Sequence, residues 1–293
     1  MLVRPVQSDD REPLDRLFEL AAECDGHFPI GEHKYLDLMG RSERGSGLVA
    51  TLGTDLIGFL AITPPRLGGV ASMELAVHPL HRSHDVFARL IEEGVGQAVE
   101  SGAHAVRVWA FQPNMVDELR RSGFTIEREL RQLRVDLPLD TAAELPAGLR
   151  EGRFRVGRDE DAWLEVNNAA FRAHPENGSW TQEILADRIA QPWFGAEGFV
   201  MVWADDRLAG FCWTKPHDDL GEIYVIAVSP DQQGRGLGRY LTVRGLEVIR
   251  SHWGFETGML YMDADNARAA ELYRKLGFRL HHVDRSLVRE VGR

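Results

Sequence analysis

The sequence predicts an α/β protein built from two tandem domains of one fold, each a mixed, mostly antiparallel twisted sheet flanked by helices. The prediction rests on short matches between the halves, which recur in the same order about 150 residues apart. The matched pairs are Gly58-Phe59 with Gly210-Phe211, Val77-His78-Pro79 with Val228-Ser229-Pro230, and Gly123-Phe124 with Gly277-Phe278. Matches in one order at nearly one spacing indicate an internal repeat.

The boundary between the two copies falls in residues 138–148, where two prolines and a glycine interrupt both the helical and the strand periodicity. We therefore expect an N-terminal domain at residues 1–140 and a C-terminal domain at residues 150–293.

Each copy has the same predicted order of elements. In the first copy we expect a strand at 1–5, a helix at 12–23, two strands around a turn at 53–55, a strand ending at Val77, a helix at 85–100, a strand at 105–111, a helix at 114–122 and a final strand from Phe124. In the second copy the same elements are expected at 152–156, at 160–171, around a turn at 204–206, ending at Val228, at 235–252, at 259–263, at 266–276 and from Phe278. An antiparallel meander followed by strand–helix–strand units is typical of a mixed sheet.

The composition, 44% hydrophobic and 27% charged, is that of a globular protein. The apolar runs are far shorter than the roughly 18 residues that a membrane span needs, so we expect no membrane partner. A net charge of −11 argues against a nucleic-acid partner, which needs a basic face. Because the chain has only two cysteines and begins without the apolar stretch of a signal peptide, we expect a cytoplasmic location, and we expect a monomer.

The stretch from Ile223 to Arg239 carries the most specific chemistry. A buried strand ends at Pro230, and a glycine-rich turn then opens a long amphipathic helix. The glycines lack Cβ atoms, so the backbone can turn tightly and approach a ligand closely. Their N–H groups and the unpaired donors of the helix N-terminus would cradle a diphosphate, with charge-assisted bonds from Arg235 and Arg239.

Two other interpretations of this turn stay open. It could be a plain strand–helix connection, or it could be the phosphate loop of a dinucleotide site. The second is disfavoured because the turn follows an antiparallel meander rather than the first strand of a domain.

The turn also matches a known signature. It resembles the acetyl-CoA pyrophosphate signature of the GNAT acetyltransferase superfamily in the pattern Val228-x-Pro230-x-x-Gln233-x-x-Gly236-x-Gly238. The superfamily's second signature is resembled downstream by Asn266-x-x-Ala269-x-x-x-Tyr273-x-x-x-Gly277-Phe278. The resemblance implies two tandem GNAT (acyl-CoA N-acyltransferase) domains, with acetyl-CoA as the donor substrate.

Three further stretches narrow the resemblance to the mycothiol synthase family. They are Phe171 to Thr181, Phe211 to Lys215 and Gly221 to Val225. This resemblance implies acetyl transfer to the cysteinyl amine of desacetylmycothiol, a small thiol-sugar amine, giving mycothiol and CoA. Two other functions stay open: N-acetylation of another small amine, such as an aminoglycoside or a polyamine, and acyl-CoA binding by a non-catalytic regulator.

The same resemblance implies catalytic roles for two residues. Glu222 would be the general base that deprotonates the acceptor amine, and Tyr273 the general acid near the CoA sulfur. From the residues alone, Glu222 could instead be a solvated acid at the start of a strand. Tyr273 could instead be a core aromatic residue, and the two roles of Tyr273 can coexist.

The predicted binding residues form two groups. Those for acetyl-CoA in the C-terminal domain are Ile226, Ala227, Val228, Gln233, Gly234, Arg235, Gly236, Leu237, Gly238, Arg239, Asn266, Ala267, Arg268, Ala269, Ala270 and Glu271. Those for the acceptor are Glu32, Glu176, Lys215, Glu222 and Tyr261, with Trp180 as a further candidate for stacking on the sugar. For each acceptor contact, a surface or core role stays open.

The N-terminal copy has lost the groups that carry this chemistry. Asp85 and Phe87 stand where the second copy has loop glycines, Arg82 stands in place of Gln233, and Ala71 in place of Glu222. We therefore expect this copy to be catalytically silent. The resemblance implies that its strand can still hold acetyl-CoA through Leu75, Ala76 and Val77, and the lost glycines count against this.

No metal site is expected. His78, His81 and His84 recur every third residue, but a strand–loop–helix junction would not present them on one face. Cys212 lies in an apolar strand, where packing is favoured over a nucleophilic role.

Overall fold

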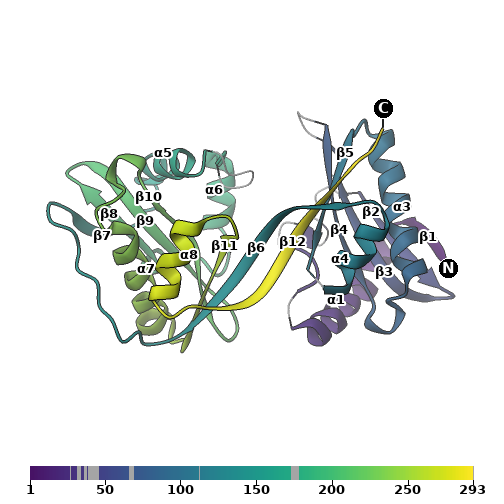
Figure 1. Ribbon diagram of the computed structural model, residues 1–293, viewed down its shortest axis with the longest axis horizontal. Coiled ribbons are helices and arrows are strands. Elements are labelled where there is room, and N and C mark those ends of the chain that lie inside the picture. Colours follow the sequence, from purple (N-terminus) through teal and green to yellow (C-terminus); the bar gives the residue numbers. More distant parts are fainter. Residues whose placement is uncertain are drawn as a thin grey trace. The chain divides into compact units, whose positions relative to one another are not determined.

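The computed structural model describes residues 1–26, 28–31, 34–35, 38, 46–65, 69–111, 113–172 and 178–292. The chain forms two compact units (Figure 1). The first unit consists of Met1–Leu130 with Val283–Arg293, and the second of Arg131–His282. The units therefore do not follow the predicted repeat boundaries at residues 140 and 150, because the last strand of each copy contributes to the other unit.

The first unit is a mixed sheet with helices packed on it. Its elements are β1 (Leu2–Pro5), α1 (Arg11–Asp25), β2 (Ser46–Leu52), β3 (Asp55–Thr63), β4 (Val70–Val77), α3 (His84–Glu100), β5 (Ala105–Ala110), α4 (Pro113–Arg121), the start of β6 (Thr125–Asp136) and the end of β12 (Arg279–Glu290). The strand order is β1-β2-β3-β4-β5-β12-β6. β4 and β5 pair in parallel, whereas β12 pairs antiparallel to β5.

The second unit repeats this plan. Its elements are the end of β6, β7 (Arg150–Arg153), α5 (Glu160–Ala170), α6 (Gln182–Ile189), β8 (Phe199–Ala204), β9 (Arg207–Pro216), β10 (Gly221–Val228), α7 (Leu237–Val248), a π-helical turn (Ile249–Trp253), β11 (Thr257–Asp263), α8 (Ala267–Lys275) and the start of β12. The strand order from β6 is β6-β11-β10-β9-β8-β7. The final strands begin at Thr125 and Arg279, one residue after the predicted starts.

The exchange of final strands is visible in the pairing of β5 and β6. β5 of the first copy pairs with β12 of the second, from Ala105↔Glu290 to Ala110↔Arg285. β6 of the first copy lies beside β11 in the second unit, where the N–H of Leu137 donates to the carbonyl of Glu256 at 2.8 Å. Each sheet is thus completed by a strand whose sequence belongs to the other copy.

The sheet of the second unit lies between two hydrophobic layers. On one face α7 packs on β9 and β10, with Leu241, Val243 and Leu246 among its buried residues. On the other face α5 covers an aromatic cluster in which Trp213 stacks on Phe199 with ring centroids 4.6 Å apart. β9 and β10 are therefore held on both faces, which fixes the backbone that the site uses.

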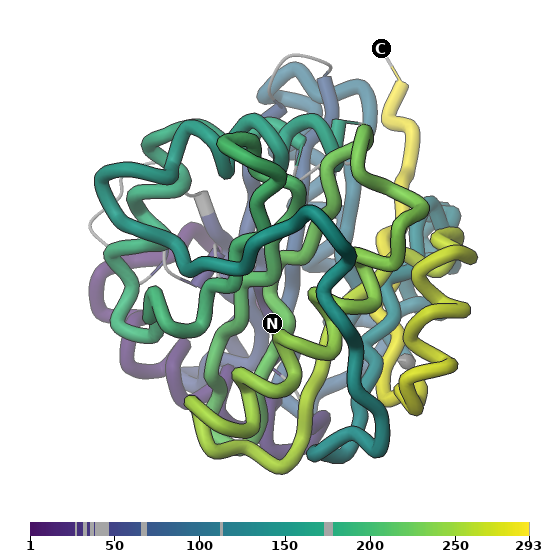
Figure 2. Tube along the Cα trace, turned by 90° about the vertical axis from the view of Figure 1, so that its left-hand side faces the viewer, coloured from purple at the N-terminus to yellow at the C-terminus, as the bar shows by residue number. Residues whose placement is uncertain are grey.

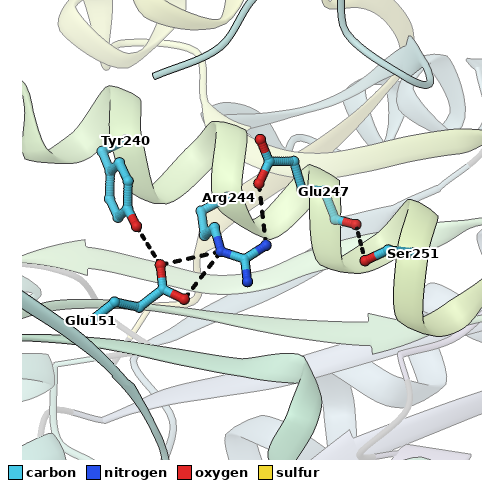
Figure 3. A network of polar contacts seen from close by, with 5 residues as sticks. All are labelled: Glu151, Tyr240, Arg244, Glu247 and Ser251. Carbon is cyan, nitrogen blue, oxygen red and sulfur yellow. Dashed lines mark hydrogen bonds and ion pairs between the residues drawn. The ribbon is translucent and has the colours of Figure 1, made fainter. Parts of the chain in front are cut away.

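Polar contacts also hold α7 in place (Figure 3). Glu151 on β7 accepts two hydrogen bonds of 3.1 Å from the Nε of Arg244 and one from the Tyr240 hydroxyl. Arg244 also donates to Glu247 at 3.1 Å, and Ser251 Oγ donates to the Glu247 carbonyl at 2.7 Å. Burial and the bond to Glu151 raise the pKa of Tyr240, so it remains a donor in this network. The helix that follows the glycine-rich turn is thereby tied to the edge strand β7.

The segment between β6 and β7 runs over the outside of the second unit, where Figure 2 shows it in teal on the near side. Leu139, Leu145 and Leu149 pack against the core that α7 covers. The segment that separates the sequence repeats is thus packed on the second unit.

Candidate functional site

The site begins where β10 and β11 separate. They pair in parallel at Gly221↔Gly258, Glu222↔Met259 and Ile223↔Leu260, and the pairing ends there although both strands continue. At the same point the register between β9 and β10 shifts, since Ile223 faces Thr214 but Val225 faces Trp213. Tyr224 is therefore the extra residue of a β-bulge, a feature that ends pairing and redirects side chains.

The separation frees one backbone edge of β10 from β11. Ile226, Ala227 and Val228 lie beyond the last β10–β11 pair while remaining paired to β9 on their other side. An extended amide-containing ligand, such as the pantetheine arm of CoA, can pair with a free strand edge as an added strand would. The free edge suits the predicted pairing of these three residues with the pantetheine arm, which stays a prediction.

The glycine-rich turn closes the end of this opening. Gly234 and Gly236 have φ of 84° and 85°, the left-handed region that other residues rarely adopt. Gly236 is the N-cap of α7, so the unpaired N–H groups of the helix start lie at the turn. A pocket of about 470 Å³ is lined by Val228, Gln232, Gln233, Gly234, Gly236, Leu237, Gly238, Arg239, Asn266, Arg268, Ala269 and Leu272.

This lining brings together most of the predicted acetyl-CoA residues and adds two, Gln232 and Leu272. Of the predicted residues in the turn and α8, Arg235, Ala267, Ala270 and Glu271 do not line the pocket. Glu271 is exposed, and hydrogen bonds from Arg274 and Lys275 lower its pKa to about 2. It belongs to the solvent face of α8.

Two predicted phosphate ligands have partners in the structure. Arg235 donates to Gln232 Oε1 at 2.6 Å and to the Ala147 carbonyl at 2.9 Å. Arg239 donates to Thr141 Oγ1 at 2.6 Å and to the Ala142 carbonyl at 2.8 Å. The two guanidinium groups therefore tie the turn to the segment before β7.

Asn266 and Arg268 connect the two signatures. Asn266 is the N-cap of α8, where its Oδ1 accepts from the N–H of Ala269 at 3.1 Å. Arg268 donates to Gln233 Oε1 at 3.2 Å, which joins α8 to the turn before α7. The side-chain oxygen of Asn266 thus holds the start of α8 at the pocket, and the predicted cofactor role of Asn266 stays a prediction.

Glu222 lies next to the point of separation. Its side chain is buried, with the residue 7% exposed, and its Oε2 lies 2.8 Å from His217 Nε2. Lys215 is its direct neighbour across the β9–β10 pair. The Nζ of Lys215 lies 4.7 Å from the centre of the Trp193 ring and 5.4 Å from that of Tyr224. Glu222 and Lys215 are thus brought together, as the prediction of a shared acceptor site requires.

Three residues of this site, His217, Trp193 and Tyr224, were not among the predicted ones. His217 could have been found from hairpin register, because pairing Lys215 with Glu222 places Pro216 opposite Gly221 and His217 at the start of the turn. The sequence carries no comparable signal for Trp193, which precedes β8 in an irregular stretch.

Tyr273 is suited to the acid role. Burial raises the pKa of its hydroxyl, so the phenol stays protonated around neutral pH. Within the described part of the chain, this hydroxyl has no hydrogen-bond partner. Its ring packs on Phe278 with centroids 5.4 Å apart, so the core role and a donor role coexist in one side chain.

The acceptor candidates differ in what the structure shows of them. Tyr261 is 38% exposed, and its hydroxyl accepts from Gln132 Nε2 at 2.7 Å. Trp180 is buried against Trp163, which favours its core role. Glu32 and Glu176 lie outside the described residues.

In the N-terminal copy the corresponding residues of β4 also lie beyond the last pair with β5, Glu74↔Trp109, but they are more enclosed. Leu75, Ala76 and Val77 are completely buried. The Val77 carbonyl accepts from Arg82 Nε at 3.2 Å, and the same guanidinium holds Asp25 through bonds of 2.7 and 2.6 Å. This arrangement counts against acetyl-CoA binding by these three residues, which stays a prediction.

The described residues contain no cluster of three or more potential metal ligands. No described helix has both the length and the apolar character that a membrane span requires. Burial raises the pKa of the Cys212 thiol, which is consistent with a packing role.

Comparisons with known proteins agree with this geometry. The model of the Acetyltransferase (GNAT) family matches residues 161–278. A mycothiol acetyltransferase from Thermobispora bispora is 38% identical over 286 residues, which cover 94% of each chain. Another from Streptomyces coelicolor is 40% identical over 280 residues, which cover 90% of this chain and 86% of that protein. The chain belongs to the mycothiol acetyltransferase family of GNAT enzymes.

Solved structures show the same fold. A tandem GNAT protein from the clavulanic acid biosynthesis pathway is similar with a TM-score of 0.78 at 18% identity, covering 100% of this chain and 99% of that one. A GCN5-related N-acetyltransferase from Sphaerobacter thermophilus is similar with a TM-score of 0.75 at 20% identity, covering 100% and 96%. The predicted tandem GNAT fold and the predicted acetyltransferase family are therefore confirmed.

Proposed function

We propose that this chain transfers the acetyl group of acetyl-CoA to the cysteinyl amine of desacetylmycothiol, releasing mycothiol and CoA. The observation that carries the proposal is the identity of 38% to mycothiol acetyltransferase over 94% of both chains. The position of Glu222 beside the opening between β10 and β11 supports it, because an acetyl transfer to an amine needs a base there.

Acetyl-CoA would be held by backbone groups rather than by charged side chains. The free edge of β10 would pair with the pantetheine arm, and the N–H groups of the turn and of the α7 N-terminus would bind the diphosphate. Gln233 and Arg268, which already contact each other, would lie at the pocket wall.

The base would act on the attacking amine, and the acid would act on the departing CoA thiolate. Glu222 would take a proton from the acceptor ammonium, and the neutral amine would attack the thioester carbonyl. When the carbon–sulfur bond breaks, Tyr273 would protonate the CoA thiolate. The phenolate of Tyr273 would then regain a proton from the nitrogen of the former amine. The backbone N–H groups of β10 beyond the bulge would stabilise the oxyanion.

The test is an acceptor screen with the purified chain and acetyl-CoA, read by mass spectrometry. Desacetylmycothiol, a polyamine and an aminoglycoside would be offered at equal concentration. We expect a gain of one acetyl group on desacetylmycothiol, on the cysteinyl nitrogen, with kcat/KM at least about 100-fold above the other two amines. A preference for either other amine would replace the proposed acceptor, and acetyl-CoA binding without any transfer would support the regulator instead.

A further inference from the structure

The proposed reaction must deliver one proton to solvent in every turnover. The acceptor amine is an ammonium at neutral pH, and the products are a neutral amide and a neutral thiol. Conversion of the ammonium to the amide removes two protons from the nitrogen. One of them replaces the proton that Tyr273 gives to sulfur. The other must leave the site. The inference that follows rests on the proposed function only in that the acceptor is an ammonium, which holds equally for other primary amines.

The base that takes this proton is poorly placed to release it. The side chain of Glu222 is only 10% exposed. In the described part of the chain, His217 is the only side chain that hydrogen-bonds to it. Once an acceptor occupies the opening, its bulk would cover the remaining exposed surface of Glu222.

His217 connects Glu222 to the outside. Its Nε2 lies 2.8 Å from Glu222 Oε2, while its side chain is 35% exposed. It stands in the hairpin between β9 and β10, where its backbone N–H donates to the Leu220 carbonyl at 2.9 Å. Asp218 and Asp219, the next two residues, are exposed. The imidazole therefore has one nitrogen on the buried base and a ring that reaches solvent.

We propose that His217 carries the proton from Glu222 to solvent. While Glu222 is ionised, its Oε2 accepts a hydrogen bond from the Nε2–H of the imidazole. After the ammonium protonates Glu222, exchange with water moves the ring proton to Nδ1 and frees Nε2. Nε2 then accepts the Glu222 proton while Nδ1–H gives a proton to water, so that one proton enters, one leaves and the starting tautomer is restored. His217 does not contact the reacting atoms and acts through Glu222.

Other charged groups near Glu222 do not offer this route. Lys215, its neighbour on β9, is turned to the rings of Trp193 and Tyr224 and can donate but not accept while charged. The neighbouring acids in the turn make no hydrogen bond to Glu222 among the described contacts. Among the described groups, the relay is therefore assigned to the imidazole.

Two substitutions separate a relay from a merely structural contact. In His217→Gln the amide can still donate a hydrogen bond to Glu222, but it cannot carry a proton. In His217→Ala a space is left that imidazole from the buffer can enter. Asp218→Asn is the matched control, since it alters a charge in the same exposed turn. The full-length enzymes would be assayed with whichever primary amine the wild-type chain acetylates in the screen.

We expect both His217 variants to lose about 10-fold or more in kcat, with the KM values for acetyl-CoA and amine changed less than about 2-fold. Added imidazole should raise kcat of His217→Ala toward the wild-type value and leave the control unchanged. Wild-type kcat in His217→Gln, or no rescue of His217→Ala by imidazole, would overturn the relay. Transfer to an amine other than desacetylmycothiol would overturn the proposed acceptor while the relay is still decided by these variants. A wild-type chain that acetylates no amine would overturn both.

Discussion

The two copies treat the same pair of strands differently. In the first unit β4 and β5 stay paired from Val70↔Ala105 to Glu74↔Trp109, and the described β3–β4 pairs show no shift of register. In the second unit the corresponding β10 and β11 separate after Ile223, where the bulge at Tyr224 lies. The bulge thus goes with an earlier end of pairing, which leaves five residues of β10 beyond its last pair with β11 but only three residues of β4 beyond its last pair with β5.

The loops after these strands differ in the same sense. In the second unit glycines leave room at the start of α7, and a pocket lies there. In the first unit Arg82 fills the corresponding place and joins the strand end to Asp25. The comparison teaches that retaining the fold does not retain the site, because the site depends on local departures from the regular sheet and helix.

The comparison is tested most severely by giving the second copy the loop of the first. Gly236→Asp copies Asp85, and it should abolish acetyl-CoA binding because a side chain at φ of 85° is strained and a carboxylate would face the diphosphate. Gly238→Phe copies Phe87 and should do the same by filling the pocket. Calorimetry measures the binding, and an unchanged circular dichroism spectrum shows that the fold persists. Wild-type affinity in both variants would remove the assignment of this pocket to acetyl-CoA.

The next largest effect concerns the base that the first copy lacks. Glu222→Gln should lower kcat/KM by roughly 10²- to 10⁴-fold, the range for losing a general base. Raising the pH should recover part of the rate, since more of the acceptor amine is then neutral without assistance. The measurement is a pH–rate profile, with Glu100→Gln at the exposed end of α3 as the matched control. Equal loss in both variants, or normal activity in Glu222→Gln near pH 7, would exclude Glu222 as the base.

A smaller effect is expected at the acid. Tyr273→Phe should lower kcat by about 10- to 100-fold and leave the acceptor KM nearly unchanged, because a thiolate is a tolerable leaving group. Burial raises the pKa of this phenol above its ordinary value of 10.0, so the donor stays protonated as the pH rises. Wild-type kcat should therefore not decline between about pH 7 and about pH 9 through loss of this proton. A fall in that range that Tyr273→Phe abolishes would contradict this account.

The smallest effect on turnover is expected in the first copy. Arg82→Gln should leave kcat unchanged while lowering the stability of the first unit by about 1.5–3 kcal/mol, because it removes charge-assisted bonds to a largely buried Asp25. His84→Ala, which loses an exposed contact to Glu118, should change neither by much. Urea unfolding and steady-state kinetics measure the two properties. A loss of turnover in Arg82→Gln without a loss of stability would show that the first copy takes part in the reaction.

The sequence predicted the repeat, the glycine turn and the order of elements except for α6 (Gln182–Ile189), which has no counterpart in the predicted plan. It did not predict the bulge at Tyr224, since Ile223 to Val228 is a continuous apolar run without a period that could show a skipped residue. The signature on α8 also gave no sign that the helix turns Glu271 toward solvent and away from the pocket lining, and the cofactor role of Glu271 stays a prediction.

The exchange of final strands was equally inaccessible to sequence reasoning. β6 and β12 follow equivalent helices and have the same length, so either could complete either sheet by its pattern alone. The contacts of Arg235 and Arg239 with the segment before β7 were missed for a related reason. A guanidinium next to a phosphate turn predicts phosphate binding, and only the folded chain shows backbone carbonyls within its reach.

The strand exchange also changes what cutting the chain would do. The segment at 137–149 looks in the sequence like a hinge between separable domains. A protease that nicked it would leave one fragment that ends with β6, a strand of the second unit, and another that ends with β12, a strand of the first. Each fragment would retain the other through a ladder of backbone hydrogen bonds. The nicked protein would migrate as a single particle under native conditions and as two chains only after denaturation. The exchanged strands, rather than the covalent segment, would then hold the two copies together.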